Sequence, residues 1–246
     1  MSDEWDFYPL LVDDQPASIY LDMGIAGSAP LPGYDQGGYL RVRMLRPQEN
    51  GLSSQEEFDD LIALEDALIG AITADSPTVY VGRNTSGGNR DFFFYMKDAK
   101  RFEDAVNAAT ARFPNYTFES GIRSDPEWKA YFEFLYPSPL SRHRMADRAL
   151  LRTLSDRGDR PDVERPIDHV AIFDDAARCR AFAAFVIDQG FTITDSSPSE
   201  DQRGRTVLSF TREDRPAQID KVTVLLVKAA LDHGGEYDGW GCEVVA

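Results

Sequence analysis

The sequence predicts an α+β protein built from two domains. Apolar residues make up 42% of the 246 residues and aromatic residues 11%, which is typical of globular proteins. In both halves, segments with strand-like composition are mixed with segments whose apolar residues recur at helical spacing. Between the halves, Pro137 and Pro139 interrupt helix and sheet and stiffen a short linker. We therefore expect one domain over residues 1–137 and a second over residues 142–246.

The chain begins with a predicted hairpin. Its strands, 5–12 and 17–23, are rich in apolar residues and flank a turn sequence at 13–16. Residues 24–38 contain five glycines and two prolines, which predicts a long loop. A strand is expected to follow over residues 39–45.

The rest of the first half predicts two longer helices and three more strands. Ser54 and Glu57 have the spacing of a capping box, and apolar residues recur behind them at Leu61, Leu64, Leu68 and Ile72. Gly87 and Gly88 form a hairpin turn between two strands. The expected order is helix from about 58, strand 78–84, strand 90–97, a helix with Phe102, Ala105, Val106, Ala109 and Phe113 on one stripe, strand 116–122 and a short helix over 125–136.

The second half opens with an arginine-rich helix, predicted over residues 142–157. The expected order after it is strand 166–173, helix 175–188, strand 191–196, strand 205–212, helix 219–233 and strand 236–245. This β-α-β-β-α-β order is that of a ferredoxin-like sandwich. Residues 221–227 are β-branched enough to form a strand, but the length of the run and Gly234 behind it favour a helix.

The charge of the chain is strongly negative, at −16. Residues 1–138 hold 23 acidic and 11 basic residues, and residues 139–246 hold 19 and 15. Nucleic-acid binding domains cluster Lys and Arg against phosphates, so we do not expect direct nucleic-acid binding. No apolar run approaches the roughly 20 residues that span a bilayer, and the acidic N-terminus has no signal sequence, so a cytoplasmic protein without membrane attachment is expected.

Residues that carry catalytic or metal chemistry are sparse. The three histidines, His143, His169 and His233, do not form a helical ligand pair, and Cys179 and Cys242 stand alone, so no metal, cofactor or catalytic site is expected. His169 and Phe173 share one face of their predicted strand. If the helices cover the other face, these two side chains lie on the open face of the sheet, where they could contact another domain or a partner.

The segment 234–241 contains four glycines and two aromatic residues. Its structural interpretation is that Gly235 ends the helix in a left-handed conformation and that Tyr237 and Trp240 pack beneath that helix. Its functional interpretation is that Glu236 and Asp238 present acid beside aromatic surface to a cationic partner. Both interpretations hold together if the ring edges stay partly exposed.

This segment, with Gly158-Asp159, residues 167–173 and Gly190-Phe191, resembles the family of regulators of ribonuclease E activity, type B. The resemblance covers residues 142–245. It implies a protein that is not an enzyme and that restrains an RNA-degrading enzyme by binding it.

The first half resembles the family of unknown function 695. The matching residues are aromatic, glycine and charged positions spread over the domain: Trp5, Tyr8, Tyr80-Val81-Gly82-Arg83, Arg90-Asp91-Phe92-Phe93-Phe94-Tyr95, Asp125, Trp128, Tyr131, Tyr136 and Pro137. The resemblance implies an α+β fold and supplies no activity.

The leading hypothesis is a regulator that recognises an arginine-rich segment of an RNA-processing protein by charge complementarity. Beside the residues of segment 234–241, the candidate acidic positions are Glu56, Asp59 and Asp60, with Asp66 on the same side of the helix. The basic helix 142–157 could instead dock on the acidic first domain of its own chain. Composition does not indicate an oligomeric state.

Two alternatives belong to other functional classes. An open ferredoxin-like sheet can stack RNA bases on aromatic side chains, for which Phe173 and Phe210 are the candidates. The first domain could also hold a small-molecule or enzymatic site around Tyr80, Arg83, Arg90 and Tyr95, which would need a pocket with convergent polar groups.

Overall fold

The computed structural model describes residues 2, 4–198 and 205–246, and the chain divides into two compact units, Met1–Pro137 and Ser138–Ala246. Both units mix sheet and helix, so the prediction of an α+β protein is confirmed. The elements of the first unit are β1 Trp5–Val12, β2 Gln15–Asp22, the 3-10 turn η1 Gly24–Gly27, β3 Gln36–Arg43, α1 Phe58–Asp75, β4 Thr78–Ser86, β5 Asn89–Met96, α2 Ala99–Thr110, β6 Thr117–Ser124 and the π-helical turn η2 Ala130–Leu135.

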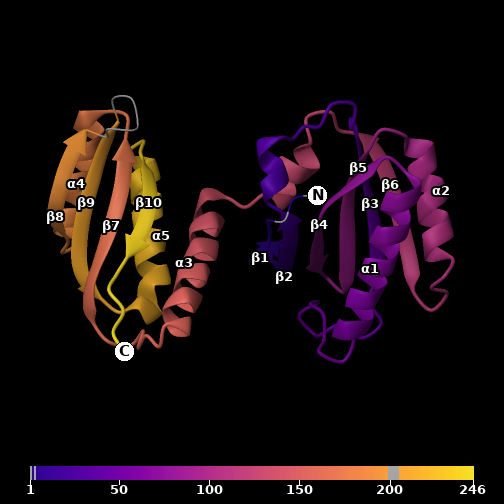
Figure 1. Cartoon of the computed structure of the whole chain (residues 1–246), viewed down its shortest axis with the longest axis horizontal. Helices are drawn as coiled ribbons and strands as arrows, with labels where there is room; N and C mark the ends of the chain where they lie inside the picture. The colour runs from indigo at the N-terminus through magenta and orange to yellow at the C-terminus, as the bar shows by residue number, and fades with distance from the viewer. Residues whose placement is uncertain (1, 3, 199–204) are drawn as a thin grey trace. The chain divides into compact units, whose positions relative to one another are not determined.

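The sheet of the first unit is antiparallel, with the strand order β1-β2-β4-β5-β3-β6 (Figure 1). The N-terminal hairpin closes through Asp13 and Asp14, which have φ values of 49° and 60°. Short acidic side chains tolerate this left-handed conformation, and two such residues in succession form the tight turn that suits twisted strands. The turn is therefore shorter than the four residues expected from sequence.

Helices α1 and α2 pack against each other and against one face of this sheet. All four of the apolar positions predicted for α1 are buried there, as are Phe92, Phe94 and Met96 of β5. Because side chains alternate along a strand, Tyr95 points to the opposite face. The unit thus has side chains packed on both faces of the sheet.

The start of α1 uses half of the predicted capping box. The Ser54 hydroxyl accepts a hydrogen bond from the Glu57 N–H at 3.3 Å. The Glu57 carboxylate does not return the bond to Ser54, as a capping box would require. It accepts instead from the N–H groups of Leu45 and Arg46, at 2.9 and 2.6 Å, and so fastens the end of the β3 segment to the helix.

On the second face of the sheet, Asp125 organises the end of the first unit. Its carboxylate accepts hydrogen bonds from the Tyr95 hydroxyl at 2.7 Å and from the N–H groups of Lys129 and Ala130 at 2.8 and 3.0 Å. Burial alone would raise the pKa of this carboxyl, but these donors hold it below its ordinary value. Trp128, which is fully buried at a φ of 55°, stacks on Tyr95 with ring centroids 4.0 Å apart.

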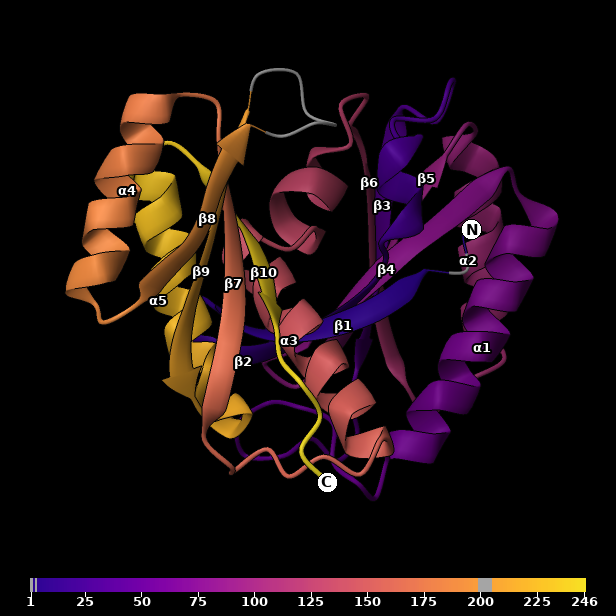
Figure 2. The same cartoon turned by 60° about the vertical axis from the view of Figure 1, so that its left-hand side comes forward.

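The second unit is a four-stranded antiparallel sheet with the order β10-β7-β9-β8. Figure 2 shows α4 and α5 on the same face of this sheet, and α3 packs beside α5. Residues 221–227 form part of α5, so the helical prediction for this segment is confirmed. The elements are α3 Pro139–Asp156, β7 Arg165–Phe173, α4 Ala176–Asp188, β8 Thr192–Pro198, β9 Thr206–Asp214, the 3-10 turn η3 Pro216–Gln218, α5 Ile219–Asp232 and β10 Glu236–Gly241.

Two boundaries in the second unit differ from the sequence prediction by more than two residues. Helix α3 begins at Pro139 and not at Arg142, because Ser138 caps the helix by accepting from the Ser141 N–H and proline is favourable at the first helical position. Strand β10 ends at Gly241, four residues earlier than expected. None of the helices in the described ranges is both long enough and apolar enough to cross a membrane.

A buried ion-pair cluster joins α1 to the sheet of the first unit. The Glu65 carboxylate of α1 accepts from Arg83 of β4, from Arg90 of β5 at 3.1 Å and from the Tyr80 hydroxyl at 3.1 Å. The Arg90 side chain is only 2% exposed. Removing the carboxylate would leave a guanidinium buried without a counter-charge, which is far costlier than losing a surface pair.

We predict that Glu65→Ala lowers the free energy of unfolding of the first unit by about 3–5 kcal/mol. The matched control is Asp60→Ala, which breaks the exposed pair with Arg46 and should cost less than about 1 kcal/mol. Denaturant unfolding followed by tryptophan fluorescence and circular dichroism measures both losses. Equal, small losses in the two variants would contradict the role given to Glu65.

Candidate partner-binding groove

The residues predicted around segment 234–241 border a groove of the second unit, which we call the β10 groove. It lies between the start of α3, the end of α5 and the start of β10. One part, of about 320 Å³, is lined by Pro139, Arg142, His143, Ala146, Val227, Leu231, Glu236, Tyr237 and Asp238. A neighbouring hollow of about 380 Å³ shares Pro139, Arg142, Leu231 and Glu236 and continues to Ile172, Asp174, Arg205, Gly234 and Gly235.

Two glycines bring the chain from α5 into β10. Gly234, and not Gly235 as expected from sequence, ends the helix in the left-handed region, with a φ of 68°. Gly235 is needed for a different reason: a Cβ atom there would lie 2.1 Å from Cε1 of Phe173. The strand can therefore approach the core only because this position carries no side chain.

A β-bulge at Asp238 determines which side chains of β10 enter the core. Tyr237 pairs with Ala171 and Trp240 with His169, and the register shifts between Tyr237 and Gly239. A regular strand would send side chains three residues apart to opposite faces. The extra residue lets Tyr237 and Trp240 share the helix-covered face, and it leaves Asp238 outside the ladder, exposed to solvent.

Beneath the groove, two hydrogen bonds hold these aromatic side chains. The Tyr237 hydroxyl lies 2.8 Å from Nδ1 of the fully buried His169. The Trp240 indole N–H donates to Oδ1 of Asp147 on α3 at 2.7 Å. The second bond fastens α3 to the sheet through a carboxylate that is itself buried, so the far wall of the groove depends on it.

Burial determines the protonation of this polar layer. It lowers the pKa of His169 to about 3, with a smaller effect from the Arg212 charge, so the imidazole is neutral. It raises the pKa of Asp147, and the Trp240 N–H opposes this by stabilising the ionised form. It raises the pKa of the Tyr237 phenol and lowers that of His143, which is half-buried at the groove.

The expectation that His169 and Phe173 lie on an open sheet face is wrong. Both are fully buried on the face covered by the helices, where His169 stacks on Phe210 at a centroid distance of 5.5 Å. Val170 and Ile172 point to the other face. Phe210 is also fully buried, so neither aromatic residue proposed for stacking RNA bases is available to do so.

The rim of the groove carries charges of both signs. Glu236 and Asp238 are exposed as predicted. Arg205, directly before β9, pairs with Asp174 at 2.6 Å and lies 3.9 Å from Glu236. Arg142 also lines the groove. The proximity of Arg205 to Glu236 could not be predicted from the sequence, because the two residues are far apart in the chain and no local pattern links them.

The other predicted acidic residues belong to the first unit. Four acidic residues are exposed just before and along the first half of α1: Glu56, Asp59, Asp60 and Asp66. Of these, Asp60 forms an ion pair with Arg46 at 3.1 Å. The predicted partner-binding residues therefore occur as a groove on one unit and an acidic helix face on the other.

The small-molecule site suggested around Tyr80, Arg83, Arg90 and Tyr95 is not assembled. The first three side chains are bound to Glu65 on the helix-covered face of the sheet. Tyr95 points to the opposite face, where it is bound to Asp125. These residues do not converge on a common cavity.

Metal-binding groups do not cluster in the part of the chain that the structure describes. No three His, Cys, Asp or Glu residues there are arranged to hold an ion. Cys179 is buried on its helix, and burial raises the pKa of its thiol. Cys242 accepts a hydrogen bond from Arg165 at 3.5 Å.

Comparison with known families divides the chain in the same region as the structure. Residues 3–136 match the model of a family of unknown function, DUF695. Residues 144–242 match the model described as regulator of ribonuclease activity B. The second match contains the whole of β10 and most of the residues that line the β10 groove.

A curated relative supports the second match. The regulator of ribonuclease activity B of Shewanella amazonensis is 31% identical over 98 residues, which cover 38% of this chain and 70% of that protein. Among solved structures, an unknown protein from Galdieria sulphuraria is 13% identical with a TM-score of 0.22, covering 86% of this chain and 99% of that chain. A microcompartment protein from Desulfitobacterium hafniense is 10% identical with a TM-score of 0.24, covering 84% and 92%. TM-scores this low do not establish a shared fold.

We predict a pH dependence of stability that comes from His169. Its pKa is depressed in the folded state from the ordinary 6.5 to about 3, so the unfolded chain binds a proton that the folded chain rejects. Stability from this group is fully present above pH 6.5 and is lost as the pH falls from there toward 3. In urea titrations, His169→Asn should reduce the slope of stability against pH by up to about 1.4 kcal/mol per pH unit. Equal slopes of stability against pH in the wild type and in His169→Asn would contradict a buried, neutral imidazole.

We predict that Trp240→Phe lowers the free energy of unfolding of the second unit by about 1–3 kcal/mol, because Asp147 then remains buried without its donor. The pKa of Asp147 should rise further in this variant, so that the loss is larger at pH 7 than at pH 4. Thermal unfolding at the two pH values measures this difference. A loss that is independent of pH would indicate that the ring contributes packing alone.

Proposed function

The chain belongs to the DUF695 family through residues 3–136 and to the regulator of ribonuclease activity B family through residues 144–242, and we propose that it is a non-enzymatic regulator of an RNA-processing enzyme. The enzyme we propose is of the ribonuclease E type, bound through an arginine-rich segment in the cytoplasm. The first unit would serve as an acidic accessory domain. The regulator family supports the class of function, and the geometry below supports the mode of binding.

We infer that the second unit is a ferredoxin-like sandwich with one additional helix at its start. The order of elements from β7 to β10 is β-α-β-β-α-β, and the strand order is β10-β7-β9-β8. Helix α3 is the addition, and it forms one wall of the β10 groove. The groove is thus built where the extra helix meets the last strand of the sandwich.

The observation that carries the proposal is the bulge of β10 within the region matched by the regulator family. It buries Tyr237 and exposes Asp238, and Glu236 is exposed beside it, so two carboxylates border the groove. A guanidinium is the cation that best fits such a site, since its planar fork of N–H donors pairs with carboxylates through two parallel hydrogen bonds. An arriving arginine would share Glu236 with Arg205, which lies 3.9 Å away.

The acidic face of α1 has a separate, long-range role in this proposal. Exposed carboxylates attract a cationic segment before contact and so raise the association rate, an effect that salt screens. Contacts in a groove mainly determine how long a complex lasts. The two surfaces should therefore affect different rate constants.

The test is a kinetic binding experiment between the full chain and the arginine-rich segment of a ribonuclease E, at several salt concentrations. Reversing Glu56, Asp59, Asp60 and Asp66 to lysine should slow association and flatten its salt dependence. Reversing Glu236 and Asp238 should mainly speed dissociation. Cleavage of a labelled RNA by the intact enzyme, with and without each variant, measures the regulatory effect.

The matched control reverses four exposed acidic residues elsewhere in the first unit: Glu103, Asp104, Glu127 and Glu133. If this control changes the association rate less than the α1 variant does, the attraction is located at α1. Association that is insensitive to every reversal and to ionic strength would reject electrostatic capture. Unchanged RNA cleavage with the wild-type chain bound would reject regulation.

A further inference from the structure

The sheet of the first unit has a trough on the face opposite α1 and α2, which we call the Arg123 trough. Its deeper part has a volume of about 240 Å³ and is lined by Gly37, Gly38, Tyr39, Phe93, Gly121, Ile122, Arg123 and Ala130. A second hollow of about 410 Å³ shares Tyr39, Phe93, Arg123 and Ala130 and continues to Arg41, Asp91 and Phe134. Small-molecule sites typically measure about 300–1,000 Å³, so the trough is of suitable size.

The trough exists because glycines replace side chains on β3 and β6. A Cβ atom at Gly121 would lie 2.7 Å from Cε1 of Tyr39, the residue that pairs with it across the strands. The Tyr39 ring therefore occupies the space that a side chain at this position would take. Gly37 likewise leaves the backbone of β3 without a side chain at the trough. These glycines leave a concave surface near the β6 edge of the sheet.

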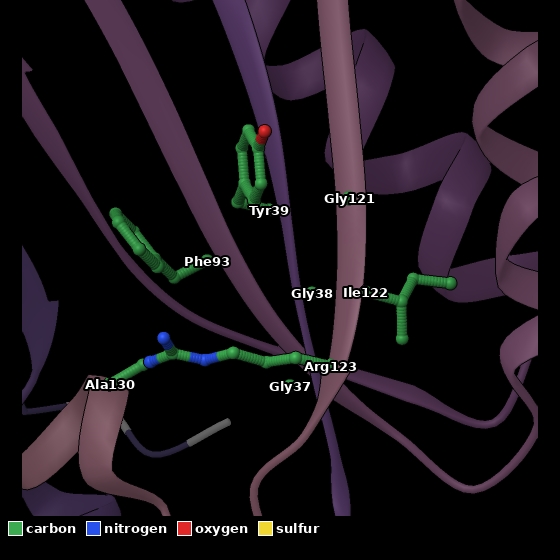
Figure 3. A pocket seen from close by; sticks show the side chains of 8 residues that line it. All are labelled: Gly37, Gly38, Tyr39, Phe93, Gly121, Ile122, Arg123 and Ala130. Carbon is green, nitrogen blue, oxygen red and sulfur yellow. The ribbon is translucent and has the colours of Figure 1, made fainter.

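Aromatic side chains form the walls of the trough. Phe93 of β5 and Phe134 of η2 lie against each other, with ring centroids 5.6 Å apart. Both rings, and that of Tyr39, are only partly buried. In Figure 3, the Arg123 side chain extends from β6 across the trough toward Ala130, on the same side as Phe93, whereas Ile122 points away. The guanidinium is thus placed beside exposed aromatic surface.

Among the residues that the structure describes, the charges around the trough are paired, except for Arg123. Arg41 binds both carboxylate oxygens of Asp91, at 2.7 and 2.9 Å. Tyr39 donates to Glu119 at 2.5 Å. Within the described ranges, the Arg123 guanidinium makes no hydrogen bond or ion pair. The nearby Asp125 carboxylate already accepts from Tyr95 and from two backbone N–H groups.

We propose that the Arg123 trough binds a small aromatic carboxylate, with the flat body against Phe93 and Tyr39 and the carboxylate on Arg123. The inference rests on the placement of an exposed guanidinium, which has no hydrogen-bond or ion-pair partner among the described residues, beside the partly exposed rings of Phe93 and Tyr39. A guanidinium binds a carboxylate through two parallel N–H donors and also stacks on aromatic rings. The site is separate from the β10 groove, and the proposal does not depend on the function proposed above.

The probe is 2-naphthoate, and the reference ligand is 2-naphthamide, which keeps the bicyclic body and removes the charge. Isothermal titration of the full chain should give a dissociation constant for the acid at least about tenfold below that for the amide, as expected for a charge-assisted hydrogen bond. Arg123→Gln should abolish this preference. Phe93→Ala should weaken binding of both ligands, with circular dichroism confirming that the variant is folded.

The matched control is Arg112→Gln, which removes an exposed arginine of the same unit outside the trough and should leave the preference intact. Equal affinity of the wild type for acid and amide would overturn the proposal. So would a preference that survives Arg123→Gln, or one that Arg112→Gln removes equally well. Sedimentation of the chain as a dimer that 2-naphthoate does not dissociate, without binding of the probe, would assign the trough to a second copy.

Discussion

The hydrogen bond from Trp240 to Asp147 is the interaction on which the second unit's groove depends. It joins the last strand, β10, to the additional helix α3. The acceptor is the buried carboxylate of Asp147. The indole reaches Asp147 only because the bulge at Asp238 turns Trp240 to the helix side. The same bulge exposes Asp238. One local irregularity of the backbone therefore both holds the wall of the groove and supplies part of its rim.

Buried carboxylates have the same structural role in the first unit. Glu65 ties α1 to two strands, Glu57 ties it to the end of β3, and Asp125 holds the π-helical turn against Tyr95. Each one is fully supplied with donors, which is the condition under which a buried charge stabilises a fold. Together with Asp147, they show that part of the acid in a chain of net charge −16 stabilises the fold. The exposed acids along α1 have no such buried contacts and can act on a partner.

Most of the element order could be predicted from sequence, because periodicity and turn residues are local signals. The orientation of β7 could not: residues 167–173 are apolar on both faces apart from Asp168 and His169, so alternation does not say which face the helices cover. The sequence therefore allows His169 to lie on the open face, whereas the structure buries it under the helices. The need for glycine at position 235 could not be predicted either, since a Cβ atom there would clash with Phe173, which lies 62 positions earlier in the chain. The exposed acids were predictable, whereas the arginines beside them depend on tertiary contacts.

The mixed charge of the β10 groove bears on selectivity more than on affinity. Glu236 already lies near Arg205, so an incoming cation gains only the difference between its own contacts and those that it replaces. A lysine offers a strongly hydrated point charge and gains little from such an exchange. An arginine offers a planar fork of N–H donors that can bind both oxygens of one carboxylate, whereas Arg205 is held by Asp174 at 2.6 Å and lies 3.9 Å from Glu236. The groove should therefore discriminate between basic segments by their arginine content, while the acidic face of α1 attracts any basic segment equally.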